Sequence, residues 1–466
     1  MPEQAERLAW LAQTIPRLLG SGIVYTLTVR DANLVATWLR SRGISAEAYT
    51  SKSDHREPLE DALLANQVKA LVATPALGMG FDKPDLAFVI HFQSPSSVVS
   101  YYQQVGRAGR ALPTAYGVLL CGAEDDHITS FFIESAFPTR AEAAAVLSAI
   151  GDAPSGLSVP ELLTQVNLSQ ARIQKTIDLL SLESPAPIVK NGSKWQLTVG
   201  SLSQSFWDRA ERLTQLRIAE KAQMAEYARL RSGHMAYLIR ALDGAAPAVE
   251  PARLVPLSEH VDPALVQDAR AFLRRTDYPI EPRKKWPPRG LPRFGATGNI
   301  PEHERARPGR ALCVWDDGGW GALVKAGKYT AERFDEALVQ AAASLIRSWP
   351  RGTTLGWVTC VPSLRRPTLV PNFAQRLAAA LGLPFYPVLQ QIGDRAEQKL
   401  MANSSKQALN LDGTLAVTGT VPPTPVLLVD DVVDSRWTFA VSAWCLIRAG
   451  SGQVYPFALA LAGGGE

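Results

Sequence analysis

Cysteine is scarce in this chain, and long apolar runs are missing from it. No C-x-x-C pair occurs, so we expect neither a disulfide framework nor a four-cysteine zinc site, and a reducing, cytosolic setting is favoured. No run of 18 or more apolar residues occurs, so we expect no membrane span. The first residues carry acids and no apolar core of a signal peptide, which argues against secretion. The four cysteines are Cys121, Cys313, Cys360 and Cys445.

A phosphate-binding loop is also missing. The pattern G-x-x-x-x-G-K-[S/T] occurs nowhere in the 466 residues. Yet residues 101–110 read YYQQVGRAGR, with Arg107 and Arg110 set among small residues. Two arginines so placed can reach a polyphosphate that another domain holds, and arginine fingers raise the rate about 10³–10⁵-fold in GTPase systems. The sequence therefore predicts one half of a phosphoryl-transfer site.

Composition is that of an ordinary soluble protein. The chain is 46% hydrophobic and 20% charged, with a net charge of +4 and a pI near 8.8. Its length suits roughly three or four domains. We expect an α/β multidomain chain, divided into a connector (1–20), an α/β domain (21–148), a helix–turn–helix with a hairpin (150–202), a helical region (203–262), a basic proline-rich linker (263–309) and a second α/β domain (310–466).

The first α/β domain shows strands alternating with helices. We expect strands at 22–26, 46–49, 69–74 and 86–92, and helices at 30–42 and 57–66 and from residue 97 onward. This alternation predicts a parallel sheet with helices on both faces. Ligands of such sheets bind at the carboxyl ends of the strands, and there we place both Thr74–Asp85 and Gly106–Arg110.

Two motifs in this domain resemble those of RecQ-like helicases of superfamily two. Residues 72–85, VATPALGMGFDKPD, match motif V, and residues 103–110 match motif VI. The region is therefore similar to the second RecA-like domain of that family. The resemblance implies Arg110 as the arginine finger, with Arg107 and Gln103 beside it, and it implies that Gly78, Gly80 and Asp82 couple ATP to strand binding. It also makes Thr50, Thr74 and Ser94 candidate contacts to DNA phosphates. The sequence departs from many members at Thr50-Ser51-Lys52, where they carry His-x-Gly.

The resemblance also implies parts that this sequence lacks. The first RecA-like domain would hold ATP and Mg²⁺, and we interpret the chain as an engineered or natural fragment that starts at the domain junction. The full-length protein would be an ATP-dependent 3′→5′ DNA helicase of a bacterial cytoplasm, acting in DNA repair. It would bind single-stranded or forked DNA, and we expect a monomer. The chain alone should lack ATPase activity.

Residues 150–202 predict a winged helix. A hydroxyl cap at Ser158 with Pro160 begins one helix, residues 170–182 form a second, and residues 188–197 form a hairpin with an Asn-Gly turn. Such modules bind DNA or pack against protein, and both readings stay open. The helical stretch 205–242, broken near Gly233, is followed by no zinc-binding cysteines, so we expect no zinc. The candidate DNA contacts in the winged helix are Arg172, Lys175, Lys190 and Lys194.

The stretch from Arg274 to Arg293 is basic. It holds seven basic residues against two acids, with Trp286 and five prolines among them. Such a patch can neutralise nucleic-acid phosphates, and Arg283, Lys284 and Lys285 are the candidate contacts. The alternative is a solvated, proline-stiffened linker.

The last domain carries a second phosphate-binding pattern. Residues 423–438, PTPVLLVDDVVDSRWT, predict a buried strand, then paired carboxylates and a hydroxyl-bearing loop, then a helix. This resembles the phosphoribosyl-pyrophosphate loop of type I phosphoribosyltransferases, and residues 357–365 and 398–410 resemble that group's pyrophosphate loop and mobile segment. Arg436 stands where the glycine of the loop is usual. The resemblance implies binding of phosphoribosyl pyrophosphate with Mg²⁺ through Asp430, Asp431, Asp434, Ser435, Arg436 and Thr438.

Three functions therefore remain open from the sequence. The leading one is the C-terminal portion of a RecQ-like helicase. The second is a phosphoribosyltransferase that acts on a nucleotide-type substrate. The third is a non-catalytic DNA-binding scaffold.

Overall fold

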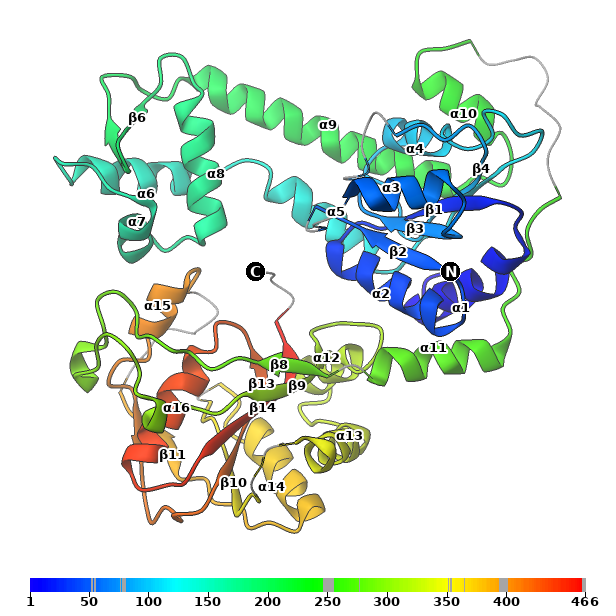
Figure 1. Cartoon of the computed structure of the whole chain (residues 1–466). Helices are drawn as coiled ribbons and strands as arrows, with labels where there is room; N and C mark the ends of the chain where they lie inside the picture. The colour runs from blue at the N-terminus through cyan, green and yellow to red at the C-terminus, as the bar shows by residue number, and fades with distance from the viewer. Residues whose placement is uncertain are drawn as a thin grey trace. The chain divides into compact units, whose positions relative to one another are not determined.

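The chain divides into two compact units in a computed structural model. Unit 1 is Met1–Phe137 with Ser203–Phe272, and unit 2 is Pro138–Leu202 with Leu273–Glu466. Figure 1 shows the elements of each unit. The residues that the structure describes are 1–51, 53, 56–75, 77, 81–245, 255–275, 277–350, 352, 354–363, 365–393 and 401–462.

A five-stranded parallel sheet forms the centre of unit 1. Its strand order is β2-β3-β1-β4-β5. The chain moves one way across the sheet through α2 and the other way through α3 and α4, so right-handed crossovers place α2 on one face and α3 and α4 on the other. The strands and helices of this part are α1 (Gln4–Thr14), β1 (Ser21–Tyr25), α2 (Val29–Ser41), β2 (Ala46–Tyr49), α3 (Arg56–Leu64), β3 (Ala70–Ala73), β4 (Leu86–His91), α4 (Val98–Val105) and β5 (Tyr116–Leu119).

The parallel sheet with helices on both faces confirms the expected fold class of this region. Ile23 and Val89 pack with Leu63 of α3 and with Val105 of α4 on one face. On α2, Trp38 is buried and donates from its indole Nε1 to the carbonyl of Leu8 at 2.7 Å. Residues 1–20, expected as a connector, therefore include a helix that packs inside the unit.

Three further helices and most of α11 complete the described part of unit 1. Tyr227 of α9 and Leu238 of α10 form an apolar cluster with Tyr101 of α4. The break between α9 and α10 ends at Gly233, whose φ of 76° is the left-handed conformation that favours glycine. The helices are α5 (Asp125–Glu134), α9 (Gln204–Arg229) and α10 (His234–Ala241), and the boundary between the units falls within α11 (Pro263–Arg275).

Unit 2 begins with three helices and a hairpin. Ser158 and Glu161 form a capping box at the start of α7, as the sequence indicates. The hairpin turn is Gly192-Ser193, because Asn191 still pairs with Lys194, so the turn lies one residue beyond the expected Asn-Gly. The elements are α6 (Arg140–Gly151), α7 (Val159–Gln165), α8 (Gln170–Ser181), β6 (Ile188–Asn191) and β7 (Lys194–Leu197).

A second five-stranded sheet follows in unit 2, with strand order β10-β13-β14-β9-β8. Neighbours are parallel except for β8, which runs antiparallel to β9. Helices α13 and α14 cover one face and α16 covers the other. The elements are β8 (Tyr278–Ile280), β9 (Gly309–Val314), α12 (Gly321–Tyr329), α13 (Glu336–Ser348), β10 (Trp357–Cys360), α14 (Leu369–Leu381), β11 (Leu389–Gln391), α15 (Ser404–Leu409), β12 (Leu415–Val417), β13 (Val426–Val433), α16 (Trp437–Arg448) and β14 (Val454–Leu461).

The basic segment is folded, which corrects the reading of it as a solvated linker. Its strand β8 joins the second sheet. Trp286 is 6% exposed and packs near Trp437 and Trp444 of α16, with ring centroids 6.2 and 5.9 Å away. Burial of this large ring fixes the segment on the domain that follows it. Among the described helices, none is long and apolar enough to cross a membrane.

Candidate functional site

The arginine-bearing segment after α4 lies at the amino end of β4. Helix α4 runs back across the sheet from its cap at Ser97, whose hydroxyl accepts from Ser100 N. The chain then turns at Gly109, with φ of 76°, and Gly109 N donates to the carbonyl of Leu86 at 2.9 Å. Leu86 is the first residue of β4, so placing Gly106–Arg110 at the carboxyl ends was wrong. Thr74, in contrast, directly follows β3 at its carboxyl end.

Arg107 and Arg110 both donate hydrogen bonds to the motif V segment, residues 72–85. Arg107 Nη1 donates to the carbonyl of Phe81 at 2.7 Å. Arg110 Nη1 donates to Asp82 Oδ1 at 2.8 Å, and the two side chains are 49% and 59% exposed. The fold thus joins the two sequence motifs through their charged residues. The predicted Gly78 and Gly80 lie outside the described residues.

The exposed Arg110–Asp82 pair is suited to exchange. Ion pairs between solvent-exposed side chains contribute about 0–1 kcal/mol. A stronger acceptor, such as a polyphosphate, can therefore take the guanidinium at small cost. The next predicted member, Gln103, is exposed one turn earlier on α4.

A buried histidine under α4 was not found from the sequence. His91 ends β4, and its Nε2 lies 2.7 Å from Gln104 Oε1. Its ring stacks on Tyr25 at 5.3 Å and lies 4.9 Å from the Tyr101 ring. Burial lowers the pKa of His91 to about 4, although the bond with Gln104 acts in the opposite direction. The neutral His91 ring therefore packs under α4 and helps to position that helix. In the sequence, the one sign of this histidine is that it is a polar residue at the end of an apolar strand.

Tyr25 lies beside this histidine with a perturbed phenol. Burial raises its pKa to about 12, and the positive charge of Arg107 acts in the opposite direction. The phenol therefore stays protonated at neutral pH, so the stack of rings under α4 carries no charge.

The predicted hydroxyl contacts to DNA differ in their burial and in the local contacts around them. Thr74 is 7% exposed, and its carbonyl accepts from Leu77 N. Thr50 Oγ1 lies 3.3 Å from Ser53 Oγ in a turn. Ser94 N donates to Asp125 Oδ2 at 2.8 Å. Because Thr50 and Thr74 are buried, these two residues offer less to a phosphate than their positions at strand ends suggested.

In unit 2 the paired carboxylates belong to the strand itself. Strand β13 continues through Asp430 and Asp431 to Val433, whereas the sequence suggested that the strand ended before them. Asp431 Oδ2 accepts from Lys328 Nζ at 2.8 Å, and Asp431 N donates to Asp430 Oδ1 at 2.8 Å. Asp434, just past the strand, accepts from Gln407 Nε2 at 2.9 Å. The three carboxylates therefore lie at the carboxyl end of β13, and hydrogen bonds hold Asp431 and Asp434 in place.

Arg436 adopts the conformation that a glycine would favour. Its φ of 68° and ψ of 1° are left-handed, and it caps the start of α16. The chain after Arg436 enters α16, and Thr438 lies in the first turn of that helix. For a residue other than glycine this conformation costs about 1–2 kcal/mol.

Arg283 of the basic segment holds this loop. Its guanidinium donates to the carbonyl of Ser435 from Nε at 2.9 Å and from Nη2 at 2.6 Å, and also to Ser404 Oγ at 3.1 Å. It stacks over the Trp437 ring at 4.7 Å. Arg283 therefore positions the loop.

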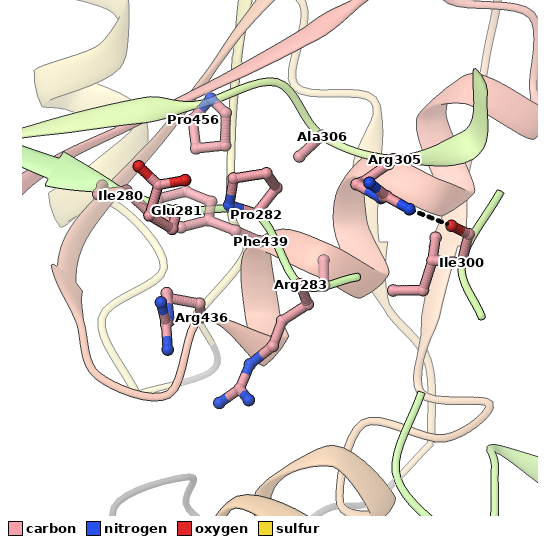
Figure 2. A pocket seen from close by; sticks show the side chains of 11 residues that line it. Ile280, Glu281, Pro282, Arg283, Ile300, Arg305, Ala306, Arg436, Phe439 and Pro456 are labelled. Carbon is pink, nitrogen blue, oxygen red and sulfur yellow. Dashed lines mark hydrogen bonds between the residues drawn. The ribbon is translucent and has the colours of Figure 1, made fainter. Parts of the chain in front are cut away.

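A small pocket lies beside this loop, between the basic segment and α16. Figure 2 shows Arg283 and Arg436 pointing toward the same open side of it, while Arg305 donates to the carbonyl of Ile300 at 2.7 Å. Glu281 also lines the pocket. The arginines give this side of the loop a positive character.

The candidate DNA contacts of unit 2 differ in their availability. Arg172 donates to both carboxylate oxygens of Glu142, at 2.9 Å from Nε and over a shorter distance from Nη2. Lys194 pairs with Glu161 at 3.4 Å, and Lys190 lies 5.8 Å from the centre of the Trp195 ring. The remaining candidates, Lys175, Lys284 and Lys285, are exposed.

A family model and several curated relatives match the first part of the chain. The model described as "Helicase conserved C-terminal domain" matches residues 9–112. The RecQ-like DNA helicase blm-1 of Caenorhabditis elegans is 36% identical over 129 residues, which are 27% of this chain and 13% of that protein. The ATP-dependent DNA helicase RecQ of Synechocystis is 41% identical over 103 residues, 22% of each protein. That of Bacillus subtilis is 37% identical over 116 residues, 24% of this chain and 20% of that one.

These matches and the parallel sheet make the first part of unit 1 a RecQ-like helicase C-terminal region with a RecA-like fold. The chain spans about one fifth or less of the length of these relatives, with alignments that cover 13% to 22% of them. A solved structure of the E. coli DEAD-box protein SrmB bound to regulator of ribonuclease activity A is similar at 25% identity, covering 28% of this chain and 78% of that one. Its TM-score is 0.26.

Proposed function

We propose that this chain is the C-terminal portion of an ATP-dependent 3′→5′ RecQ-like DNA helicase that acts in DNA repair. The observation that supports this most is the pairing of the two helicase motifs, in which Arg110 meets Asp82 at 2.8 Å inside the region that the helicase model matches. ATP and Mg²⁺ would be held by a first RecA-like domain of the full-length protein. This chain would supply the arginine that completes the site.

Arg110 would act on the charge that develops during phosphoryl transfer. Its guanidinium leaves Asp82 for the transferring phosphate, where positive charge lowers the barrier. Arg107 would hold the motif V segment through its bond to the Phe81 carbonyl. Freed from Arg110, Asp82 could report the state of ATP to the neighbouring residues 78–80, which the family resemblance links to strand binding.

DNA would be bound through cations on several elements. Lys175 of α8 and Lys190 of β6 are candidates if residues 150–202 act as a winged helix, and Lys284 and Lys285 add exposed charge in unit 2. Arg172 and Arg283 are only partly exposed and would contribute less than the exposed lysines. Phosphate contacts of this kind release counterions, so affinity should fall steeply with salt.

A second candidate function is a phosphoribosyltransferase that acts on a nucleotide-type substrate. It is favoured by the order of features along β13 and α16: paired aspartates, a left-handed residue at Arg436, then a helix start that can bind a phosphate. Vicinal ribose hydroxyls would donate to Asp430 and Asp431. A third candidate, a DNA-binding scaffold, would keep the cations and have neither activity.

Binding and turnover by the chain itself test the leading proposal. We expect fluorescence anisotropy to show binding of forked or single-stranded DNA that weakens about 50- to 150-fold between 50 and 200 mM salt, the loss that about four phosphate contacts predict. We expect no ATP hydrolysis with or without DNA, since the proposed ATP-holding domain is outside this sequence. Hydrolysis by this chain would contradict the proposal of a shared site, and absence of DNA binding would contradict the helicase assignment.

A further inference from the structure

A lysine forms an ion pair with the acidic end of β13. Lys328 Nζ lies 2.8 Å from Asp431 Oδ2, and the two side chains are only 23% and 14% exposed. Lys325 on the same helix, α12, forms a pair with Asp316 whose side chains are 50% and 42% exposed. Since a partly desolvated ion pair is less screened than an exposed one, Lys328 is the stronger partner of its carboxylate.

Aromatic rings and a second cation hold Lys328 in place. Its ammonium lies 5.8 Å from the centre of the Trp315 ring. Arg366, after β10, donates from Nη1 to the carbonyl of Lys328 and lies over the Tyr329 ring at 4.8 Å. The end of α12 is thus pinned beside β13, and the lysine is built into the site.

The donor set fits a divalent cation poorly. Mg²⁺ binds oxygen ligands in octahedral geometry, and a lysine ammonium within 3 Å of a carboxylate repels it. Among the residues that the structure describes, no group of three or more His, Cys, Asp or Glu side chains could hold a metal ion. Asp431 is already paired with the Lys328 ammonium, so the structure argues against the Mg²⁺ that the sequence predicted at Asp430 and Asp431.

We infer that Lys328 serves as an internal counter-ion that replaces a directly bound divalent metal, so that this strand end takes a sugar phosphate without Mg²⁺. The hydroxyls of such a ligand donate to the carboxylates, and an anionic oxygen of the ligand accepts from the Lys328 ammonium. The identity of the ligand rests on the transferase-like proposal. The replacement of the metal rests on the lysine alone.

Manganese binding tests the role of the lysine without any sugar ligand. In titrations followed by electron paramagnetic resonance, we expect the wild-type chain to bind no stoichiometric Mn²⁺ at micromolar concentrations. Lys328→Met should bind Mn²⁺ measurably more tightly than the wild type, because the repulsion by the ammonium is gone, and adding Asp431→Asn should abolish this gain. Lys325→Met is the matched control and should resemble the wild type. Circular dichroism checks folding, and Lys328→Gln is the second variant if methionine disturbs it.

The opposite results would overturn the inference. Stoichiometric Mn²⁺ binding by the wild type that Asp431→Asn removes would show that the lysine leaves room for a metal. Failure of both folded Lys328 variants to gain Mn²⁺ would show that the ammonium is not what keeps it out.

Calorimetry with ribose 5-phosphate tests the ligand separately. Equal affinity in EDTA and in Mg²⁺ is expected for the wild type, with a loss of about tenfold or more in EDTA for Lys328→Met. Binding that requires Mg²⁺ would overturn the inference. If no protein binds the sugar phosphate in either buffer, the transferase-like proposal fails, and the manganese titration still decides the role of Lys328.

Discussion

Single residues carry both proposed sites, and most of them were visible in the sequence. Arg110 and Asp82 lie in separate motifs that the fold joins at 2.8 Å. Lys328 was not found, because nothing near it in sequence indicates that it meets Asp431. His91 was also missed, since a polar residue at the end of an apolar strand gives no sign of its neighbours. Residue types that a motif fixes are thus predictable, whereas partners brought by distant packing are not.

Arg436→Gly should stabilise unit 2 by about 0.5–1 kcal/mol. Glycine removes the cost of about 1–2 kcal/mol that the left-handed conformation imposes on arginine. Its greater flexibility in the unfolded chain offsets about 0.5–1 kcal/mol of this stabilisation. Urea denaturation followed by tryptophan fluorescence measures the change. Arg436→Ala keeps the strain and is the control, so equal stability of the two variants would count against strain at this position.

The buried His91 should make unit 1 less stable in acid. Its pKa is lowered to about 4 in the folded state from 6.5, so the unfolded chain binds the proton first. Stability from this group is complete above pH 6.5 and is lost as pH falls toward 4, at up to about 1.4 kcal/mol per pH unit. His91→Gln should flatten the dependence of the unfolding free energy on pH in this window. An unchanged slope would show that His91 titrates normally in the folded chain.

At the scale of elements, local signals were reliable and long-range placement was not. The start of α7 was predicted because its signals, the cap at Ser158 and Pro160 in the first turn, are local. The same holds for β1 to β4 of the first sheet, whose apolar runs are short, whereas β5, which is only partly buried, was not predicted. The position of Gly106–Arg110 was wrong, because the length of α4 and the bond of Gly109 to Leu86 decide it. The basic segment was interpreted in part as a linker, because its five prolines are typical of linkers and the contacts that bury Trp286 come from residues distant in sequence.

Trp286→Ala should destabilise unit 2 by about 3–5 kcal/mol. The indole is 6% exposed and packs near Trp437 and Trp444, so its removal leaves a cavity at α16. Urea denaturation monitored by far-ultraviolet circular dichroism measures the loss. Lys285→Ala, an exposed neighbour in the same segment, should change stability by less than about 0.5 kcal/mol. If both substitutions changed the unfolding free energy by a similarly small amount, the segment would behave as a linker and not as part of the folded domain.

At the scale of the whole molecule, the helicase region matches relatives of which it covers 13% to 22%. The arginine that would act on ATP is exposed and weakly paired, as a group that serves a partner site should be. The second unit has exposed lysines, which we propose as DNA contacts, and an acidic strand end that pairs with Lys328.

The most direct test of the central proposal is DNA-stimulated ATP hydrolysis by the full-length protein with Arg110→Ala. We expect kcat to fall by about 10³-fold while DNA affinity stays within about twofold, because the arginine acts on the transferring phosphate. Arg40→Ala is the matched control, since Arg40 forms a similarly exposed pair with Glu47 at 3.0 Å, and it should leave kcat unchanged. Full turnover by the Arg110→Ala protein would contradict the account.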